Sequence, residues 1–165
     1  MPINIEAIVT DKGREALLKS WGQFVVFSEM TTFKVGEGGW EDTAGGRVPR
    51  DPTDEGTFAN RGPTLTDLDC ISNPSDYPSD SRGNFSKGLT SGDFAVSGNT
   101  ILEITCYLAM ADFNDDGNGN FPEIYEVGVF DAGGDMVAYG TCPVVEKNPA
   151  VDRTFVIKIS ALRSS

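Results

Sequence analysis

Alternation of apolar and polar residues predicts strands over much of the second half of this chain. The clearest run is 100–110, where every second residue is apolar and falls on one face of an extended chain. Both faces become apolar toward its end, which is typical of a strand inside a sheet. Shorter runs of the same kind predict strands at 123–130, 136–141 and 154–160.

A tight hairpin is expected between two of these strands. Polar and apolar residues alternate over 126–129, the pattern of a half-buried strand. Residues 131–135 interrupt the pattern, and Gly133 and Gly134 are expected to supply the positive φ that a short turn requires. The chain then returns as an antiparallel strand over 136–140.

The N-terminal part predicts one strand and one helix. Residues 3–9 form a short apolar stretch, either a strand or an extended arm. Thr10 can cap a helix that runs to Trp21, with Asp11 favourable in its first turn and Gly13 weakening it. Its expected buried stripe consists of Ala16, Leu17 and Trp21. Two further strands are expected at 23–28 and 31–35.

Turn-forming residues dominate 40–82, so we expect a long irregular loop there. Loops of this length inside a compact domain are uncommon and are usually functional or mobile. Two interpretations remain open. The segment is a surface loop in its own right, or it becomes ordered against a neighbouring subunit. In the second case its apolar residues would gain burial there; these are Phe58, Leu65, Leu68 and Tyr77.

Together these patterns predict a single domain over 1–165 of the α+β class, mainly β. A short N-terminal helix precedes an antiparallel, β-sandwich-like domain with a long irregular loop. The expected parts are an arm and helix at 1–22, first strands at 23–39, the loop at 40–82 and a C-terminal β-region at 83–165.

The charge and cysteine content narrow the classes of partner and compartment. A net charge of −12 repels phosphate and anionic membrane surfaces, so neither nucleic acid nor membrane is an expected partner. Cys70, Cys106 and Cys142 are odd in number and widely spaced, which argues against a disulfide framework and suits a reducing cytoplasm. We expect no secretory signal and no membrane-spanning segment, because the required apolar runs are missing.

The sequence contains no histidine, which excludes catalytic triads and zinc sites that use that residue. Nucleotide-binding and metalloprotease motifs are also missing. We therefore expect a non-enzymatic protein.

One segment fits the twelve-residue calcium-loop template. From Asp112 to Glu123, oxygen-bearing residues occupy the ligand positions and Gly117 the sharp turn. The expected ligands are Asp112, Asn114, Asp116, the Asn118 carbonyl and Glu123. Strand patterns on both sides replace the helices of the usual motif, and Gly119 stands where an aliphatic residue is preferred. The alternative is an ordinary polar hairpin loop without Ca²⁺.

Several blocks of this sequence are similar, in order, to the phage tail-collar fibre family. The C-terminal hairpin block Glu-Val-Gly-Val-Phe-Asp, followed by Gly-Gly-Asp and an apolar strand, resembles the family's signature. The other similar blocks are 8–18, 33–39, 142–147 and 155–159. The middle of the chain, 40–82, departs from the family pattern, and we expect the family's attachment domain without its long fibrous shaft.

The resemblance implies a structural protein of the virion, assembled in the host cytoplasm. Its role would be that of a baseplate-peripheral adaptor that attaches tail fibres, with a baseplate protein and a tail fibre protein as partners and a homotrimer as the expected assembly. The implied backbone-shaping residues are Gly36, Gly38, Gly128, Gly133 and Gly134, with Lys147 as an interface cation.

The alternative function is a calcium-stabilised β-sandwich module that binds carbohydrate. Aromatic side chains commonly stack on sugar rings, and four of them are candidates for that role: Trp21, Trp40, Tyr77 and Tyr125.

Overall fold

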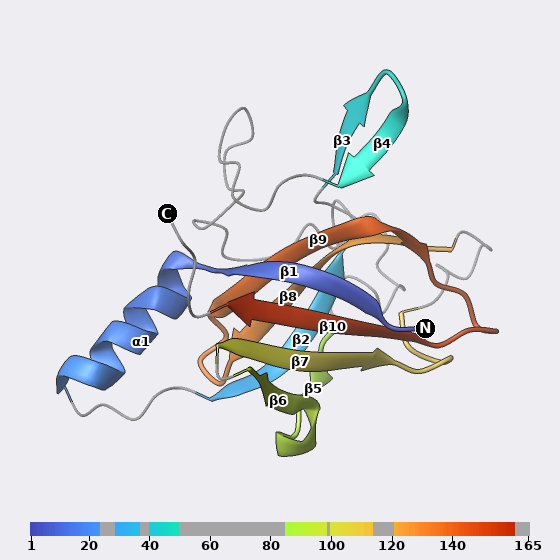
Figure 1. The fold of residues 1–165 in the computed structure, drawn as a ribbon. Coiled ribbons are helices and arrows are strands. Elements are labelled where there is room, and N and C mark those ends of the chain that lie inside the picture. The colour runs from blue at the N-terminus through green and yellow to red at the C-terminus, as the bar shows by residue number, and fades with distance from the viewer. Residues whose placement is uncertain (24–28, 37–39, 50–84, 99, 114–120, 161–165) are drawn as a thin grey trace.

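The chain folds into a curled β-sheet with one helix at its side (Figure 1). The computed structural model describes residues 1–23, 29–36, 40–49, 85–98, 100–113 and 121–160. Most of these residues are in strands, which confirms the expected α+β class with mainly β-structure.

Ten strands, one α-helix and one 3₁₀ turn make up the described part of the chain. In order they are β1 (Ile3–Val9), α1 (Asp11–Gln23), β2 (Met30–Gly36), β3 (Trp40–Thr43), β4 (Gly46–Pro49), β5 (Lys87–Gly88), η3 (Ser91–Asp93), β6 (Phe94–Ser97), β7 (Ile101–Leu108), β8 (Glu123–Asp131), β9 (Met136–Glu146) and β10 (Arg153–Ser160). The strands expected at 31–35, 100–110, 123–130, 136–141 and 154–160 are thus confirmed, with β9 longer than expected.

The main sheet has eight strands in the order β5-β2-β8-β9-β1-β10-β7-β6. It is mixed, which corrects the expectation of a purely antiparallel domain. The N-terminal strand β1 lies between β9 and β10, antiparallel to β9 and parallel to β10. Because β9 and β10 run in opposite directions, a strand inserted between them must be parallel to one of the two.

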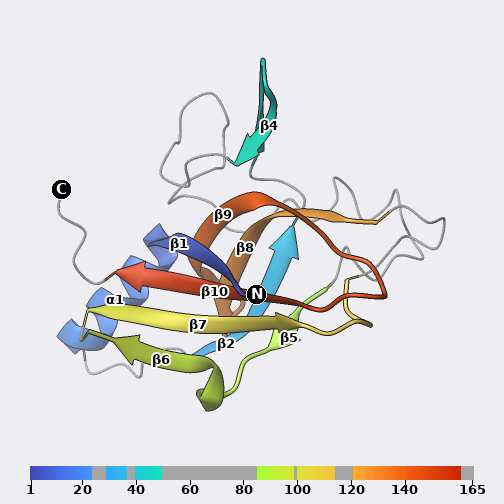
Figure 2. The same ribbon diagram turned by 45° about the vertical axis from the view of Figure 1, so that its right-hand side comes forward.

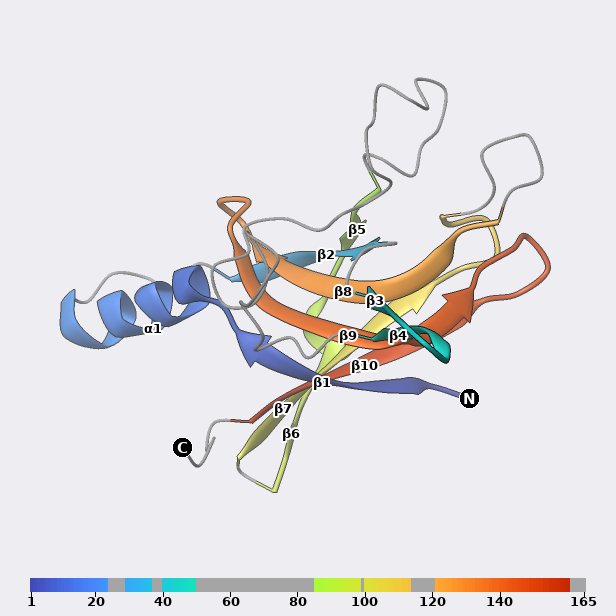
Figure 3. The ribbon, with the colours of Figure 1, turned by 90° about the horizontal axis from the view of Figure 1, so that it is seen from above.

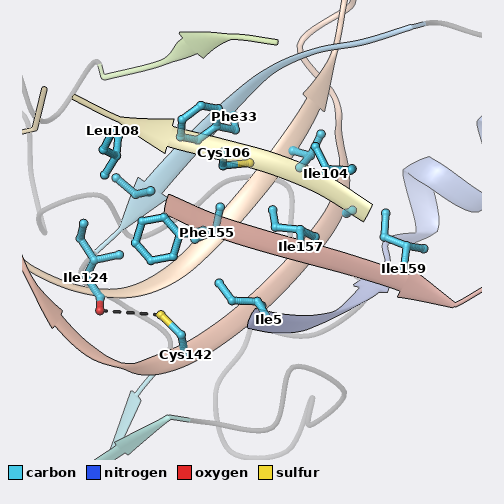
Figure 4. Close-up of a cluster of buried hydrophobic side chains, with 14 of the residues drawn as sticks. Ile5, Phe33, Ile104, Cys106, Leu108, Ile124, Cys142, Phe155, Ile157 and Ile159 are labelled. Atoms are coloured by element: carbon cyan, nitrogen blue, oxygen red, sulfur yellow. Dashed lines mark hydrogen bonds between the residues drawn. The ribbon is translucent and has the colours of Figure 1, made fainter. Parts of the chain in front are cut away.

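The core lies inside the curl of this single sheet. Figure 3 shows the strands curving, and Figure 4 shows side chains from strands far apart in the sheet meeting in one cluster. Phe33 of β2, Ile104 of β7 and Phe155 of β10 are each at most 1% exposed within it. The sheet therefore folds around one core, and the structure does not confirm a sandwich of two sheets.

Side chains join the β5 end of the sheet to the region that follows β7. Lys87 of β5 forms an ion pair with Asp112, and its Nζ lies 5.1 Å from the centre of the Tyr107 ring. The Phe85 ring lies 6.4 Å from that of Phe33 and 5.5 Å from that of Phe113. These contacts connect the two sides of the curl without backbone pairing.

Helix α1 begins as the sequence predicts. The Gly13 N–H donates to Thr10 Oγ1 over 3.1 Å, so Thr10 is the N-cap, and Asp11 lies in the first turn. The helix continues to Gln23, two residues past the expected end at Trp21. Residue 23 therefore does not begin a strand, and the rest of the strand expected at 23–28 lies outside the described residues.

A small hairpin, β3–β4, occupies the first part of the segment that was expected to be irregular (Figure 2). Its turn is stabilised by the Thr43 hydroxyl, which donates to the Gly46 carbonyl over 2.7 Å. Gly46 has φ of +108°, a conformation that glycine adopts without strain. The expectation of irregular structure was wrong for 40–49, and the loop interpretation of 50–82 lies outside the described residues.

Candidate interaction site

The N-terminus of α1 is fixed directly to the C-terminal hairpin of β8 and β9. Thr10 is fully buried; its N–H donates to the Val137 carbonyl over 3.1 Å and its hydroxyl to the Met136 carbonyl. A Cβ on Gly13 would lie 2.3 Å from the Val137 carbonyl oxygen. Gly13, which sequence reasoning treated only as a weak helix former, is thus what lets the helix approach β9 this closely.

Strand β8 is buried on both faces, which corrects the expectation of a half-buried strand. Glu126 and Val127 are both 0% exposed although they lie on opposite sides of the strand. The Tyr139 hydroxyl donates to Glu126 Oε2 over 2.9 Å, so the carboxylate is bonded inside the protein. The alternation was correct, but the polar face is covered by other parts of the chain.

One of the glycines implied by the resemblance, Gly36, lies beside this buried carboxylate, and a second, Gly128, lies two residues from Glu126 on the same strand. A Cβ on Gly36 would lie 2.4 Å from Glu126 Oε1, so only glycine fits there without displacing the glutamate. Gly128 is buried in β8, opposite Lys34 on one side and Tyr139 on the other. Gly38 lies outside the described residues.

The β8–β9 turn uses one glycine where two were expected. Gly134 has φ of +87°, whereas Gly133 does not have a positive φ. The Asp131 Oδ1 atom accepts N–H groups from Gly133 and Asp135, each over 2.9 Å. An aspartate turn therefore replaces the second left-handed residue.

Lys147 is 0% exposed, which corrects its assignment as an interface cation. Its Nζ donates to the carbonyl oxygens of Met110 and Asn148 over 3.1 and 3.0 Å. Burial lowers the pKa of Lys147, while the charge of Asp112 acts in the opposite direction. The lysine thus fixes the chain near both ends of 112–123, since its N–H also donates to the Pro122 carbonyl over 3.1 Å.

The first and last residues of the calcium-loop motif already have partners within the protein. Asp112 pairs with Lys87 and accepts the Ala109 N–H over 2.9 Å. Burial acts to raise the pKa of Asp112, but these two hydrogen bonds and the charges of Lys87 and Lys147 together outweigh it, and the pKa lies below its ordinary value. Glu123 forms an ion pair with Arg47, with 3.5 Å between Glu123 Oε2 and Arg47 Nη1.

The other expected ligands, Asn114, Asp116 and Asn118, lie outside the described residues. Within the part of the chain that is described, no three acidic, cysteine or histidine side chains are grouped so that they could hold a metal ion.

A cluster of aromatic and charged side chains joins the β3–β4 hairpin to the start of β8. The Arg47 guanidinium lies 4.0 Å from the centre of the Trp40 ring, and the Trp40 and Tyr125 rings are 6.2 Å apart. The Tyr125 hydroxyl donates to Glu123 over 3.3 Å. Burial, and then the Glu123 charge, raise the pKa of Tyr125.

The structure therefore brings together two of the four expected sugar-stacking aromatics, Trp40 and Tyr125. The side chain of Trp21 and the whole of Tyr77 lie outside the described residues. Arg47, which sequence reasoning did not select, contacts both Trp40 and Glu123. Its position next to a glycine turn gives no local signal that could have identified it.

Comparison with known proteins adds no relative: no family model, no curated protein sequence and no solved structure matches this chain. Among the residues that the structure describes, no helix is long and apolar enough to cross a membrane.

Proposed function

We propose that this chain is a non-enzymatic structural protein of a phage tail, a baseplate-peripheral adaptor that attaches tail fibres. The sequence blocks that resemble the tail-collar fibre family carry this proposal. They are far apart along the chain, and the described parts of three of them pack against one another.

The observation with most weight is the contact between α1 and the β8–β9 hairpin. Thr10 and Gly13, from the first similar block, contact Met136 and Val137, from the signature block. The second block, of which 33–36 is described, pairs with β8, and its Gly36 adjoins Glu126. Thr10, Gly13 and Gly36 are thus explained by one structural feature, the buried junction of α1 and β2 with the β8–β9 hairpin. That is what a family-level pattern would be expected to retain.

The adaptor would work by assembly. Helix α1 extends away from the sheet in Figure 1, and Leu18 on it is 66% exposed. An exposed leucine on a projecting helix is a suitable anchor for a baseplate protein, while the β-domain would hold the fibre and form the homotrimer. Such a protein would be assembled in the host cytoplasm and remain in the virion. The net charge of −12 disfavours nucleic acid and anionic membranes as partners.

Labelling of phage particles tests this proposal. Gold-labelled antibody against the chain should mark the distal tail of the phage that encodes it, and the purified chain should bind tail proteins encoded beside it. We expect Leu18→Glu to weaken baseplate binding without lowering the melting temperature. Val144→Glu, at another exposed apolar residue, is the matched control. Particles that contain none of the chain would overturn the proposal.

The second candidate is a calcium-stabilised, β-sandwich-like module that binds carbohydrate. The Trp40, Arg47 and Tyr125 cluster favours it, because aromatic rings beside charged side chains can both stack on a sugar ring and bond its hydroxyl groups. Glycan-array binding that requires Ca²⁺ and is lost in Trp40→Ala would support this candidate. Equal melting temperatures in millimolar Ca²⁺ and in chelator, together with an array that shows no binding, would exclude it.

A further inference from the structure

The β3–β4 hairpin is a separate two-stranded sheet beside the main one. Neither of its strands belongs to the eight-stranded sheet, and in Figure 1 the hairpin stands out from that sheet. None of its described side chains is buried: Trp40 and Val48 are half-buried, and the others that are described are exposed. A two-stranded hairpin is only marginally stable by itself, so the position of β3–β4 depends on what its base contacts.

Arg47 connects this hairpin to the start of β8. Its guanidinium lies 4.0 Å from the centre of the Trp40 ring within the hairpin, and its Nη1 lies 3.5 Å from Glu123 Oε2 on β8. Burial raises the pKa of Tyr125, and a hydrogen bond from Arg47 acts in the opposite direction. One exposed arginine thus contacts residues on both sides of the boundary between hairpin and sheet.

Tyr125 is buried where the hairpin meets the sheet. It is 3% exposed, yet it belongs to neither of the two buried hydrophobic clusters of the described chain. The Trp40 ring lies 6.2 Å from the Tyr125 ring, so the base of the hairpin supplies part of its cover. Tyr139, which is 1% exposed, lies instead in the second cluster and donates to Glu126 within the main sheet. The two tyrosines are almost equally buried, but by different parts of the chain.

We propose that β3–β4 is a movable arm whose base closes over Tyr125, and that this arm opens while the main sheet stays folded. The side chains of Arg47 and Glu123 are 48% and 50% exposed, and an ion pair so open to solvent holds the arm only weakly. Segments open locally where few side chains are buried, and the arm buries none of those that are described.

Opening of the arm would uncover Tyr125 beside the Glu123 carboxylate, to which the tyrosine hydroxyl donates over 3.3 Å. In the closed position Arg47 covers one face of the Trp40 ring and Tyr125 is buried, so Tyr125 can stack on a ligand only when the arm is open. The arm therefore controls access to this ring. Its movement needs neither the tail assignment nor a bound sugar, so its failure and the failure of either proposed function are separate results.

Chemical modification of tyrosine tests the arm in a full-length chain. Tetranitromethane nitrates tyrosines that reach solvent, and peptide mass spectrometry gives the rate at each position. The reagent also oxidises thiols, so the chain carries Cys70→Ser; Cys106 and Cys142 are buried. A buried tyrosine reacts only when the structure opens, so its rate follows the population of the open form. We expect Tyr125 to react at least tenfold faster than Tyr139, because only the arm has to move.

Loss of the contact between arm and sheet should open the arm further. Arg47→Met keeps an unbranched side chain beside Trp40 but removes the charge. It should raise the Tyr125 rate at least threefold, while the Tyr139 rate and the melting temperature stay unchanged. Glu123→Gln breaks the same ion pair from the side of β8 and should have the same effect. Added salt should raise the Tyr125 rate in the parent and not in these variants, because salt screens an exposed ion pair.

The matched control is Lys158→Met, which breaks an ion pair of 3.7 Å with Glu103 on the main sheet and should change neither rate. Nitration of Tyr125 that is no faster than that of Tyr139 would overturn the proposal, because one unfolding event would then release both. A Tyr125 rate that either arm variant leaves unaltered, that rises together with the Tyr139 rate, or that Lys158→Met raises equally would overturn it as well.

Discussion

Strand β8 is buried on both faces along almost its whole length, whereas β7 and β10 bury one face and leave the other partly open to solvent. The two regions belong to the same sheet and share one core. The difference lies in what covers the outer face. Beside β8 and β9 that face holds a second buried cluster of Ile8, Phe130, Met136 and Tyr139.

The comparison shows where polar residues have a structural role. In the doubly buried region Thr10 and Glu126 are each 0% exposed and bonded within the protein. In the region with one open face, Glu103 and Lys158 pair across neighbouring strands at about a third exposure. A buried polar group that loses its partner costs more free energy than an exposed one, so equal substitutions should have unequal effects.

The largest effect is expected where the helix contacts β9. Gly13→Ala places a methyl group 2.3 Å from the Val137 carbonyl oxygen, a backbone atom that also accepts the Thr10 N–H. We expect a net loss of about 3 kcal/mol in the free energy of unfolding, after the helical preference of alanine has offset part of the overpacking. Urea unfolding measures it. Gly92→Ala, whose nearest neighbour would be 3.8 Å away, should change stability by less than about 0.5 kcal/mol.

Removing one tyrosine hydroxyl from each region compares the doubly buried region around β8 directly with the open face of β7. Tyr139→Phe removes the donor to buried Glu126 and should cost about 2 kcal/mol. Tyr107→Phe removes a bond to Asp152 from a side chain that is 43% exposed, and should leave the unfolding free energy almost unchanged. The measurement is the unfolding free energy of each variant. Equal losses would mean that the buried hydroxyl is no more important than the exposed one.

Asp112→Asn tests the contact between the two sides of the curl. Loss of the ion pair with Lys87 should cost about 1 kcal/mol at pH 7, because both side chains are partly exposed. The folded-state pKa of Asp112 lies below its ordinary value of 3.8, so this stabilisation is present above pH 3.8 and is lost as the pH falls through the folded-state pKa. The difference between variant and parent should therefore shrink in acid. A constant difference would assign the effect to packing.

Patterns among residues close together in the sequence predicted strands and the start of the helix. The alternation at 100–110 gave β7, and Thr10 gave the helix start, because strand faces and caps are determined by residues a few positions apart. The burial of Glu126 could not be predicted in this way, since it depends on segments distant in sequence that cover the outer face. The need for glycine at position 13 could not be predicted locally either, because it depends on the carbonyl oxygen of Val137, which is distant in the sequence.

The candidate site was predictable to a smaller extent. Trp40 and Tyr125 were identified by residue type, and the structure places them side by side. The family resemblance implied that Lys147 is an interface cation, yet its Nζ donates to the carbonyl groups of 110 and 148 within the chain. A charged residue at a strand end does not reveal whether nearby chain carbonyls will surround it.

The smallest effect is expected on the open face, at the cross-strand pair of Glu103 and Lys158. Their charged atoms are 3.7 Å apart and the side chains are 32% and 29% exposed. Solvent screening and the entropy of two long side chains leave little net attraction, so a double-mutant cycle with Glu103→Gln and Lys158→Met should give a coupling of about 0.5 kcal/mol or less, decreasing with added salt. A coupling above about 1.5 kcal/mol that salt leaves unchanged would mean that this face is desolvated in solution, by a partner or a second copy. In that case the contrast with β8 would have to be withdrawn.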